Sequence, residues 1–101
     1  MKKIINGKLY DTDTANLLGE WDNGDNGEFT FVIEKLYQKK NGEYFMYGSG
    51  GALTQYAMSH GPHTVSGSRC LTPLSDADAR LWSETHLSAD EHIDLFGPVS
   101  E

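Results

Sequence analysis

Three residues that bind zinc well lie close together in the second half of the chain. His60 and His63 are separated by two residues, and Cys70 follows in the same segment. Imidazole nitrogen and thiolate sulfur are the donors that Zn²⁺ takes in tetrahedral protein sites, and the glycine and proline beside the histidines suit a loop around an ion. The spacing therefore predicts a zinc site on this segment.

A tetrahedral site needs a fourth ligand, and this segment does not supply one. His86, on the last turn of a predicted helix, is the preferred candidate. The alternatives are His92 or a carboxylate such as Glu84 or Asp78. With four protein ligands the zinc would be structural, and it would pin the C-terminal helices to the β-rich part of the chain.

Two other interpretations of these residues stay open. His60 and His63 can be exposed loop residues, with Cys70 a small buried hydrophobe, as free cysteines often are. Cys70 can also be a nucleophile activated by a histidine, which requires a thiolate of lowered pKa in a partly open, electropositive pocket. Arg69 would supply positive charge, but the strand-like sequence leading into Pro73 does not favour such a pocket.

The C-terminal part of the chain is strongly acidic. Residues 73–101 hold seven acids against Arg80 alone, which is -6 of the chain's net charge of -7. Such a surface is usually just solvated, and the functional alternative is docking into a basic channel of a nucleic-acid-handling protein, where complementary charge speeds association. The residues predicted to bind such a partner are Asp76, Asp78, Glu84, Asp90, Glu91 and Asp94.

Turn signals divide the first 72 residues into strands. Asn6-Gly7 and Asn41-Gly42 each predict a β-hairpin, because Asn-Gly adopts the positive φ angles of a tight hairpin turn. Strands are expected at 15–22 and within 28–38. Short connections favour pairing between neighbours, so the strands are expected to form a small antiparallel meander.

Several details of this β-rich part are more specific. Phe29, Phe31 and Ile33 alternate with Thr30 and Val32. This spacing predicts that the three residues lie on one face of their strand. The glycine-rich segment 48–51 is expected to be a turn or bulge, and 52–59 a short helix. An exposed tyrosine of the sheet would serve as an aromatic anchor for a partner, and the candidates are Tyr37 and Tyr47.

Residues 73–101 are expected to be helical. Ser75 and Ser88 each stand at a helix start, with an acid three residues later, as in a capping box. The apolar stripe of the second helix is expected to be Ala89, Ile93 and Phe96. Two short helices packed on one face of a small antiparallel sheet make an α+β fold, formed as a single domain over residues 1–101.

Composition limits the classes of function. A chain of 101 residues leaves little room for a deep substrate cleft with a lid, which disfavours large enzymes. The net charge of -7 repels phosphate backbones and anionic headgroups, so direct binding to nucleic acid or membranes is not expected. No segment resembles a signal peptide or a membrane span, and the single cysteine cannot form an internal disulfide, which predicts a cytoplasmic protein.

Several segments resemble a group of short proteins carried by phages and conjugative elements of bacteria. They are MKKIINGKLYDTDTA at 1–15, EKLY at 34–37, YFMYGSGGA at 44–52 and PLS at 73–75. Among proteins of such elements, the chain is similar in character to zinc-containing type II-A anti-CRISPR proteins from streptococcal prophages. That resemblance implies binding to Cas9, interference with guide or target-DNA loading, and a metal at His60 and His63.

The residues and the resemblance together predict a non-enzymatic anti-CRISPR protein with a structural zinc. It would bind Cas9 or another CRISPR effector inside the bacterial host cell and block nucleic-acid engagement. One alternative is a small metal-dependent hydrolase or nuclease that uses His60, His63 and an acid, with a metal-bound water of lowered pKa. Another is a regulatory adaptor of a mobile element.

Overall fold

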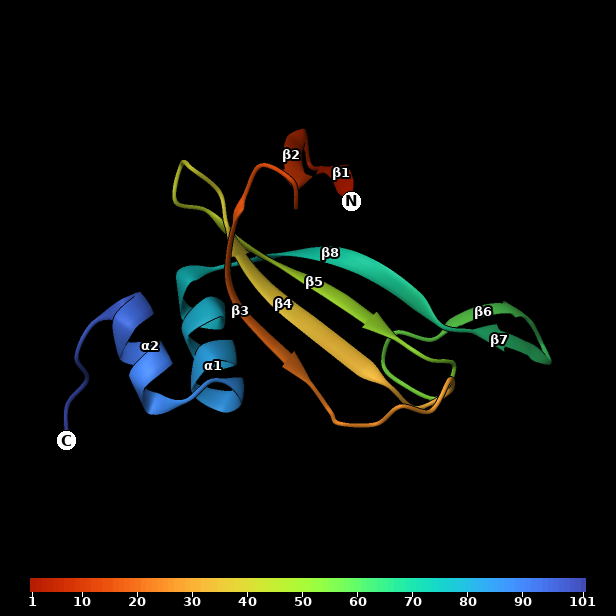
Figure 1. Ribbon diagram of the computed structural model, residues 1–101. Helices are drawn as coiled ribbons and strands as arrows, with labels where there is room; N and C mark the ends of the chain where they lie inside the picture. Colours follow the sequence, from red (N-terminus) through yellow and green to blue (C-terminus); the bar gives the residue numbers. More distant parts are fainter.

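The computed structural model describes residues 1–101 and has an α+β architecture, as the sequence predicts. Its central antiparallel sheet has four strands, with two helices packed on one face (Figure 1). The sheet consists of β3 (Asn16–Asp22), β4 (Val32–Gln38), β5 (Tyr44–Gly50) and β8 (Ser68–Leu74). The other elements are β1 (Lys2–Ile5), β2 (Lys8–Asp11), β6 (Met58–Gly61), β7 (Thr64–Ser66), α1 (Asp76–His86) and α2 (Ala89–Phe96).

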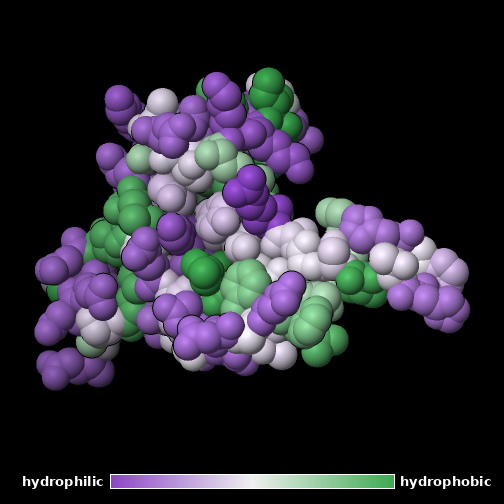
Figure 2. All heavy atoms as spheres, turned by 45° about the vertical axis from the view of Figure 1, so that its right-hand side comes forward, coloured by the Kyte–Doolittle hydropathy of each residue, from purple (hydrophilic) through white to green (hydrophobic).

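The sheet is a meander with one insertion. β3, β4 and β5 pair in chain order, and β8 pairs with β5 after the β6–β7 hairpin. Figure 2 shows this hairpin as an arm that projects from the body of the molecule. Neither helix is long and apolar enough to cross a membrane.

The β1–β2 hairpin forms where Asn6-Gly7 predicts it. The φ angles of Asn6 and Gly7 are 51° and 77°, as the tight hairpin turn requires. Tyr10 of β2 packs its ring edge-on against Phe45, with the ring centroids 5.5 Å apart. The hairpin therefore covers one end of the sheet, on the face opposite the helices, through a small core of Tyr10, Tyr37, Phe45 and Leu71.

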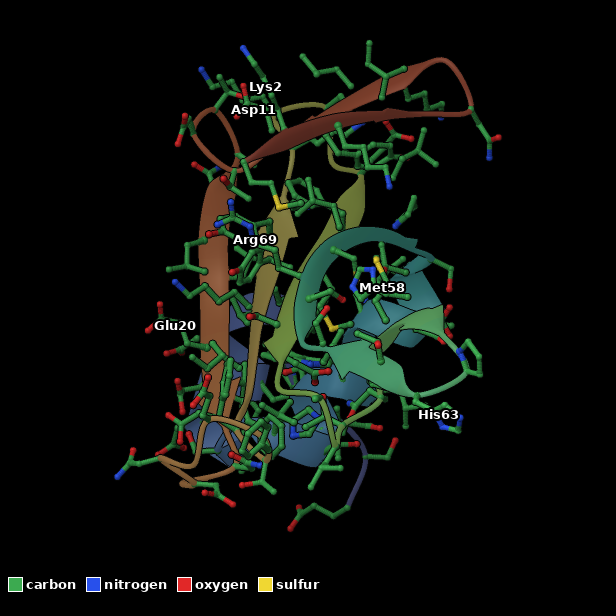
Figure 3. The ribbon with its side chains drawn as sticks, turned by 90° about the vertical axis from the view of Figure 1, so that its right-hand side faces the viewer. Lys2, Asp11, Glu20, Met58, His63 and Arg69 are labelled. Atoms are coloured by element: carbon green, nitrogen blue, oxygen red, sulfur yellow. The ribbon has the colours of Figure 1, made fainter.

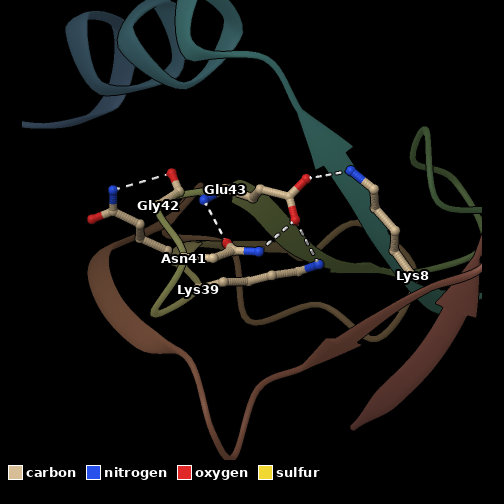
Figure 4. Close-up of polar contacts among 6 residues, drawn as sticks. Lys8, Lys39, Asn41, Gly42 and Glu43 are labelled. Carbon is tan, nitrogen blue, oxygen red and sulfur yellow. Dashed lines mark hydrogen bonds and ion pairs between the residues drawn. The ribbon is translucent and has the colours of Figure 1, made fainter.

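One carboxylate ties this hairpin to the turn between β4 and β5 (Figure 4). Lys8 donates from Nζ to Oε2 of Glu43 at 2.7 Å. Oε1 of Glu43 accepts hydrogen bonds from Asn41 at 2.9 Å and from Lys39 at 3.3 Å. Since a two-stranded hairpin is only marginally stable alone, these contacts and Tyr10 hold it in place.

Glu43→Gln is expected to lower the Tm in a pH-dependent way. Hydrogen bonds from Lys8, Asn41 and Lys39 hold the pKa of Glu43 down to about 2, against 4.5 for a free side chain. A carboxyl whose pKa falls on folding stabilises the fold above its unfolded pKa, and that contribution disappears as the pH falls through its folded pKa. The Tm difference between Glu43→Gln and wild type should thus shrink between pH 4.5 and 2. A difference that stays constant over this range would contradict the assignment.

The central sheet differs from the sequence prediction in which side chains of β4 are buried. Val32, Glu34 and Leu36 face the helices, whereas Ile33 is 37% exposed on the other face. Phe29 lies in a turn before the strand and is 58% exposed. The predicted face was therefore wrong by one residue, because a carboxylate occupies a buried position that hydrophobic alternation assigns to the surface.

Two other local predictions were wrong. The glycine-rich segment does not interrupt β5, which continues through Gly48, Ser49 and Gly50. Segment 52–59 is not a helix, because turns at 52–56 lead directly into β6. These turns place the Tyr56 ring against Gly48, where any side chain would occupy the same space. Close packing between distant segments, which local sequence does not encode, decides both differences.

Both helices begin at the predicted caps. Ser75 accepts from the backbone N–H of Asp78, and Ser88 forms a reciprocal capping box with Glu91. The buried face of α2 differs from the prediction, since His92 is buried and Ile93 is 40% exposed. Nδ1 of His92 lies 2.8 Å from Oγ of Ser83, so a polar contact joins the two helices. The predicted apolar stripe of α2 is consequently turned partly outward.

Candidate functional site

The four predicted zinc ligands lie on three different parts of the fold. His60 and His63 belong to the β6–β7 hairpin, where both are exposed, and Figure 3 shows His63 at the end of that arm. Nε2 of His60 lies 2.6 Å from Oγ of Ser66 on the facing strand. Cys70 is half-buried on β8, opposite Gly48 of β5.

His86 lies at the end of α1, beneath the sheet and away from the hairpin. Its ring centroid is 4.2 Å from that of Trp21 and 5.2 Å from that of Trp82. The structure contains no group of three or more His, Cys, Asp or Glu side chains placed to hold a metal ion. As placed, His60, His63, Cys70 and His86 do not fit one zinc ion, and the zinc site stays a prediction without support from this arrangement.

The alternative ligands do not complete the site either. His92 is buried between the helices against Ser83, and Glu84 and Asp78 are exposed on α1. The nucleophile interpretation of Cys70 also lacks a partner, because its recorded polar contact is with Thr72, at 3.9 Å between Sγ and Oγ1. No histidine approaches the thiol in hydrogen-bonding geometry.

A buried polar cluster, which the sequence analysis missed, lies between the sheet and α1. The carboxylate of Glu34 points from β4 toward the helices and is 8% exposed. Nε1 of Trp82 donates to its Oε1 at 3.1 Å, and the hydroxyl of Tyr56 donates to its Oε2. Nε2 of His86 lies 3.6 Å from Oε1, within ion-pair distance when the imidazole is protonated.

Distant segments assemble this Glu34 cluster. β4 contributes the carboxylate, α1 contributes Trp82 and His86, and the turn before β6 contributes Tyr56. Burial, followed by the hydrogen bond and charge of Glu34, raises the pKa of Tyr56 far above its ordinary value. The phenol therefore stays protonated and remains a donor to the carboxylate.

The geometry of the Glu34 cluster indicates a structural role. Every buried polar side-chain atom has a hydrogen-bond partner. Glu34 and Tyr56 are buried, and none of the surface cavities is lined by Glu34, Tyr56 or His86. One sequence signal pointed to the site, since Glu34 stands two residues from both Val32 and Leu36 and thus on the same strand face.

The predicted partner-binding acids form the other candidate site, on the outer surface of the two helices. All six are exposed. Asp76 pairs with Arg80 at 2.7 Å and Glu91 completes a helix cap, so these two carboxylates have structural partners. The other four acids have no recorded ion pair, and they are Asp78, Glu84, Asp90 and Asp94.

The two tyrosines considered as interface anchors differ in exposure. Tyr37 is buried, with 8% of its surface exposed, and its ring stacks on Phe45 with the ring centroids 5.3 Å apart. It is therefore part of the core and not an anchor. Tyr47 is half-buried on the sheet face opposite the helices, with Nζ of Lys35 5.9 Å from its ring centroid.

Comparison with protein-family models, curated proteins and solved structures found no match to this chain.

Proposed function

We propose that this protein is a non-enzymatic inhibitor that docks the acidic surface of α1 and α2 onto a basic, nucleic-acid-handling surface of another protein. Its partner would be Cas9 or a related CRISPR effector, as the sequence resemblance implies, and it would act in the bacterial cytoplasm. Docking would compete with guide or target-DNA loading, because both need the same basic surface.

The observation that carries the proposal is the separation of charge within the fold. Residues 73–101 supply -6 of the net -7, and Arg80, their one base, is paired with Asp76. The remaining acids therefore present a negative surface without basic neighbours on the same helices. Complementary charge between such a surface and a basic partner raises the association rate and orients the complex.

Glu84→Lys/Asp94→Lys is expected to weaken binding to the Cas9–guide complex by about tenfold or more and to reduce the salt dependence of binding. Both positions lie in the last turn of their helix, where a positive charge is favourable, so the caps and the fold are retained. Binding is measured by interferometry across a salt series, and inhibition by DNA cleavage.

The matched control is Asp13→Lys/Glu28→Lys, which makes the same change in charge at exposed positions outside the helices. The control should bind and inhibit like the wild type. If both double variants lose the same amount of affinity for Cas9, the effect is due to net charge and not to the helical surface. Wild-type protein that neither binds Cas9 nor inhibits cleavage would rule out this partner.

A further inference from the structure

An apolar groove lies open on the acidic helical surface. It has a volume of about 250 Å³, smaller than most small-molecule pockets, and Glu84 is one of the residues that line it. Ile93 and Val99 line it and are 40% and 58% exposed. A groove of this kind fits one or two apolar side chains of a protein segment that also carries positive charge.

A surface of matching chemistry lies on the β1–β2 hairpin. Ile4 and Leu9 are a cross-strand pair on its outer face, and they are 71% and 53% exposed. Together with Lys2 and Lys3 they line a shallow hollow. The hairpin, residues 2–11, contains three lysines and one acid, Asp11, which lies opposite Lys2. Lys8 is held by Glu43, whereas Lys2 and Lys3 have no recorded ion pair.

The two surfaces of one chain face apart. The hairpin packs on Tyr37 and Phe45, and the helices pack on Leu36 of the opposite sheet face. Figure 1 shows the hairpin above the sheet and the helices at its lower left. The hairpin of one chain therefore cannot reach the groove of the same chain, but it can contact the groove of a second molecule.

We propose that the groove on α2 binds the β1–β2 hairpin of a second copy of this chain. Ile4 and Leu9 would lie against Ile93 and Val99, and the lysines beside them would approach Glu84 and the other helical acids. The contact uses two different surfaces, so it is head-to-tail, and each added copy leaves one groove and one hairpin free. The size of the assembly consequently grows with concentration.

Self-association covers the same acidic helical surface that we propose for the partner, so the two contacts exclude each other. A contact made by one short hairpin is small, in the range of transient interfaces. The monomer is the binding-competent form, and dilution releases it.

The test is sedimentation velocity of the full chain over a concentration series at low salt. Wild type should show an average mass that rises with concentration, and raising the salt from about 0.05 M to about 0.5 M should weaken association about tenfold. Glu84→Lys/Asp94→Lys removes the acceptor surface and leaves the hairpin intact. Ile4→Thr/Leu9→Thr removes the apolar anchor, and threonine retains the tendency to form a strand.

Each double variant alone should be monomeric. Their equimolar mixture should form a dimer and stop there, because only one productive hairpin and one productive groove remain. Asp13→Lys/Glu28→Lys should associate like the wild type. Circular dichroism confirms that each variant is folded. A wild type that stays monomeric, an associating Ile4→Thr/Leu9→Thr variant, or a mixture without dimers would each overturn the proposal, independently of Cas9 binding.

Discussion

Glu34→Ala should destabilise the protein by about 2 to 6 kcal/mol, because it leaves two buried hydrogen-bond donors without an acceptor, at about 1 to 3 kcal/mol each. Trp82 and Tyr56 both donate to this carboxylate. Without it, a buried indole N–H and a buried hydroxyl have no acceptor, and each unsatisfied group adds its own desolvation cost. The loss also removes the polar contact between β4 and α1, which then touch only through the packing of Ala79 and Trp82 on Leu36.

Denaturant unfolding followed by tryptophan fluorescence measures this effect, since Trp82 is part of the cluster. Glu34→Gln keeps one carbonyl acceptor and should fall between Glu34→Ala and wild type. The matched control is Glu20→Ala on the neighbouring strand, whose exposed side chain pairs only loosely with Lys35, at 3.7 Å. That control should change stability by about 0.5 kcal/mol or less. If Glu34→Ala lowers the free energy of unfolding by less than about 1 kcal/mol, the cluster does not have this structural role.

Gly48→Ala is expected to have the second largest effect and to lower the free energy of unfolding by about 2 to 4 kcal/mol. This estimate adds the cost of overpacking to that of a lost hydrogen bond to a charged acceptor. A Cβ at this position would clash with two ring carbons of Tyr56 and with its hydroxyl oxygen. The ring would have to move away from the sheet, and Glu34 would lose the donor to its Oε2.

A double-mutant cycle separates this cause from ordinary loss of a strand glycine. In a Tyr56→Ala background the added methyl group has free space, so Gly48→Ala should then cost little or nothing. Ser49→Ala, at the next residue of β5 on the opposite face, is the control for changes to the strand itself. If Gly48→Ala lowers the free energy of unfolding equally with and without the Tyr56 ring, the clash with that ring does not cause the destabilisation.

The structural and functional predictions concern different surfaces and can fail separately. Glu34 and Gly48 are buried against Tyr56, and their substitution reports on unfolding. Glu84 and Asp94 lie on the outside, in last helical turns where lysine is compatible with the fold. A variant of the second pair that keeps its Tm and loses binding therefore identifies a docking surface and not a folding defect.

Features that depend on neighbouring residues in the chain could be predicted from the amino-acid sequence. Asn6-Gly7 determined a hairpin turn because its φ requirements are local. Ser75 and Ser88 determined the helix starts because a cap bonds to a backbone N–H three residues away. The segregation of acidic residues in the last third of the chain is also a property of sequence alone.

Contacts between side chains that are distant in sequence could be identified only in the folded structure. The face of β4 depends on Trp82 and Tyr56, which lie 48 and 22 residues away and make a buried Glu34 tolerable. The path of residues 48–56 depends on an aromatic ring that packs on bare glycine backbone. His60 and His86 look like members of one ligand set, yet the fold places them on a projecting hairpin and beneath the sheet. Contacts between distant segments depend on packing and desolvation over the whole fold, and spacing along the chain does not encode them.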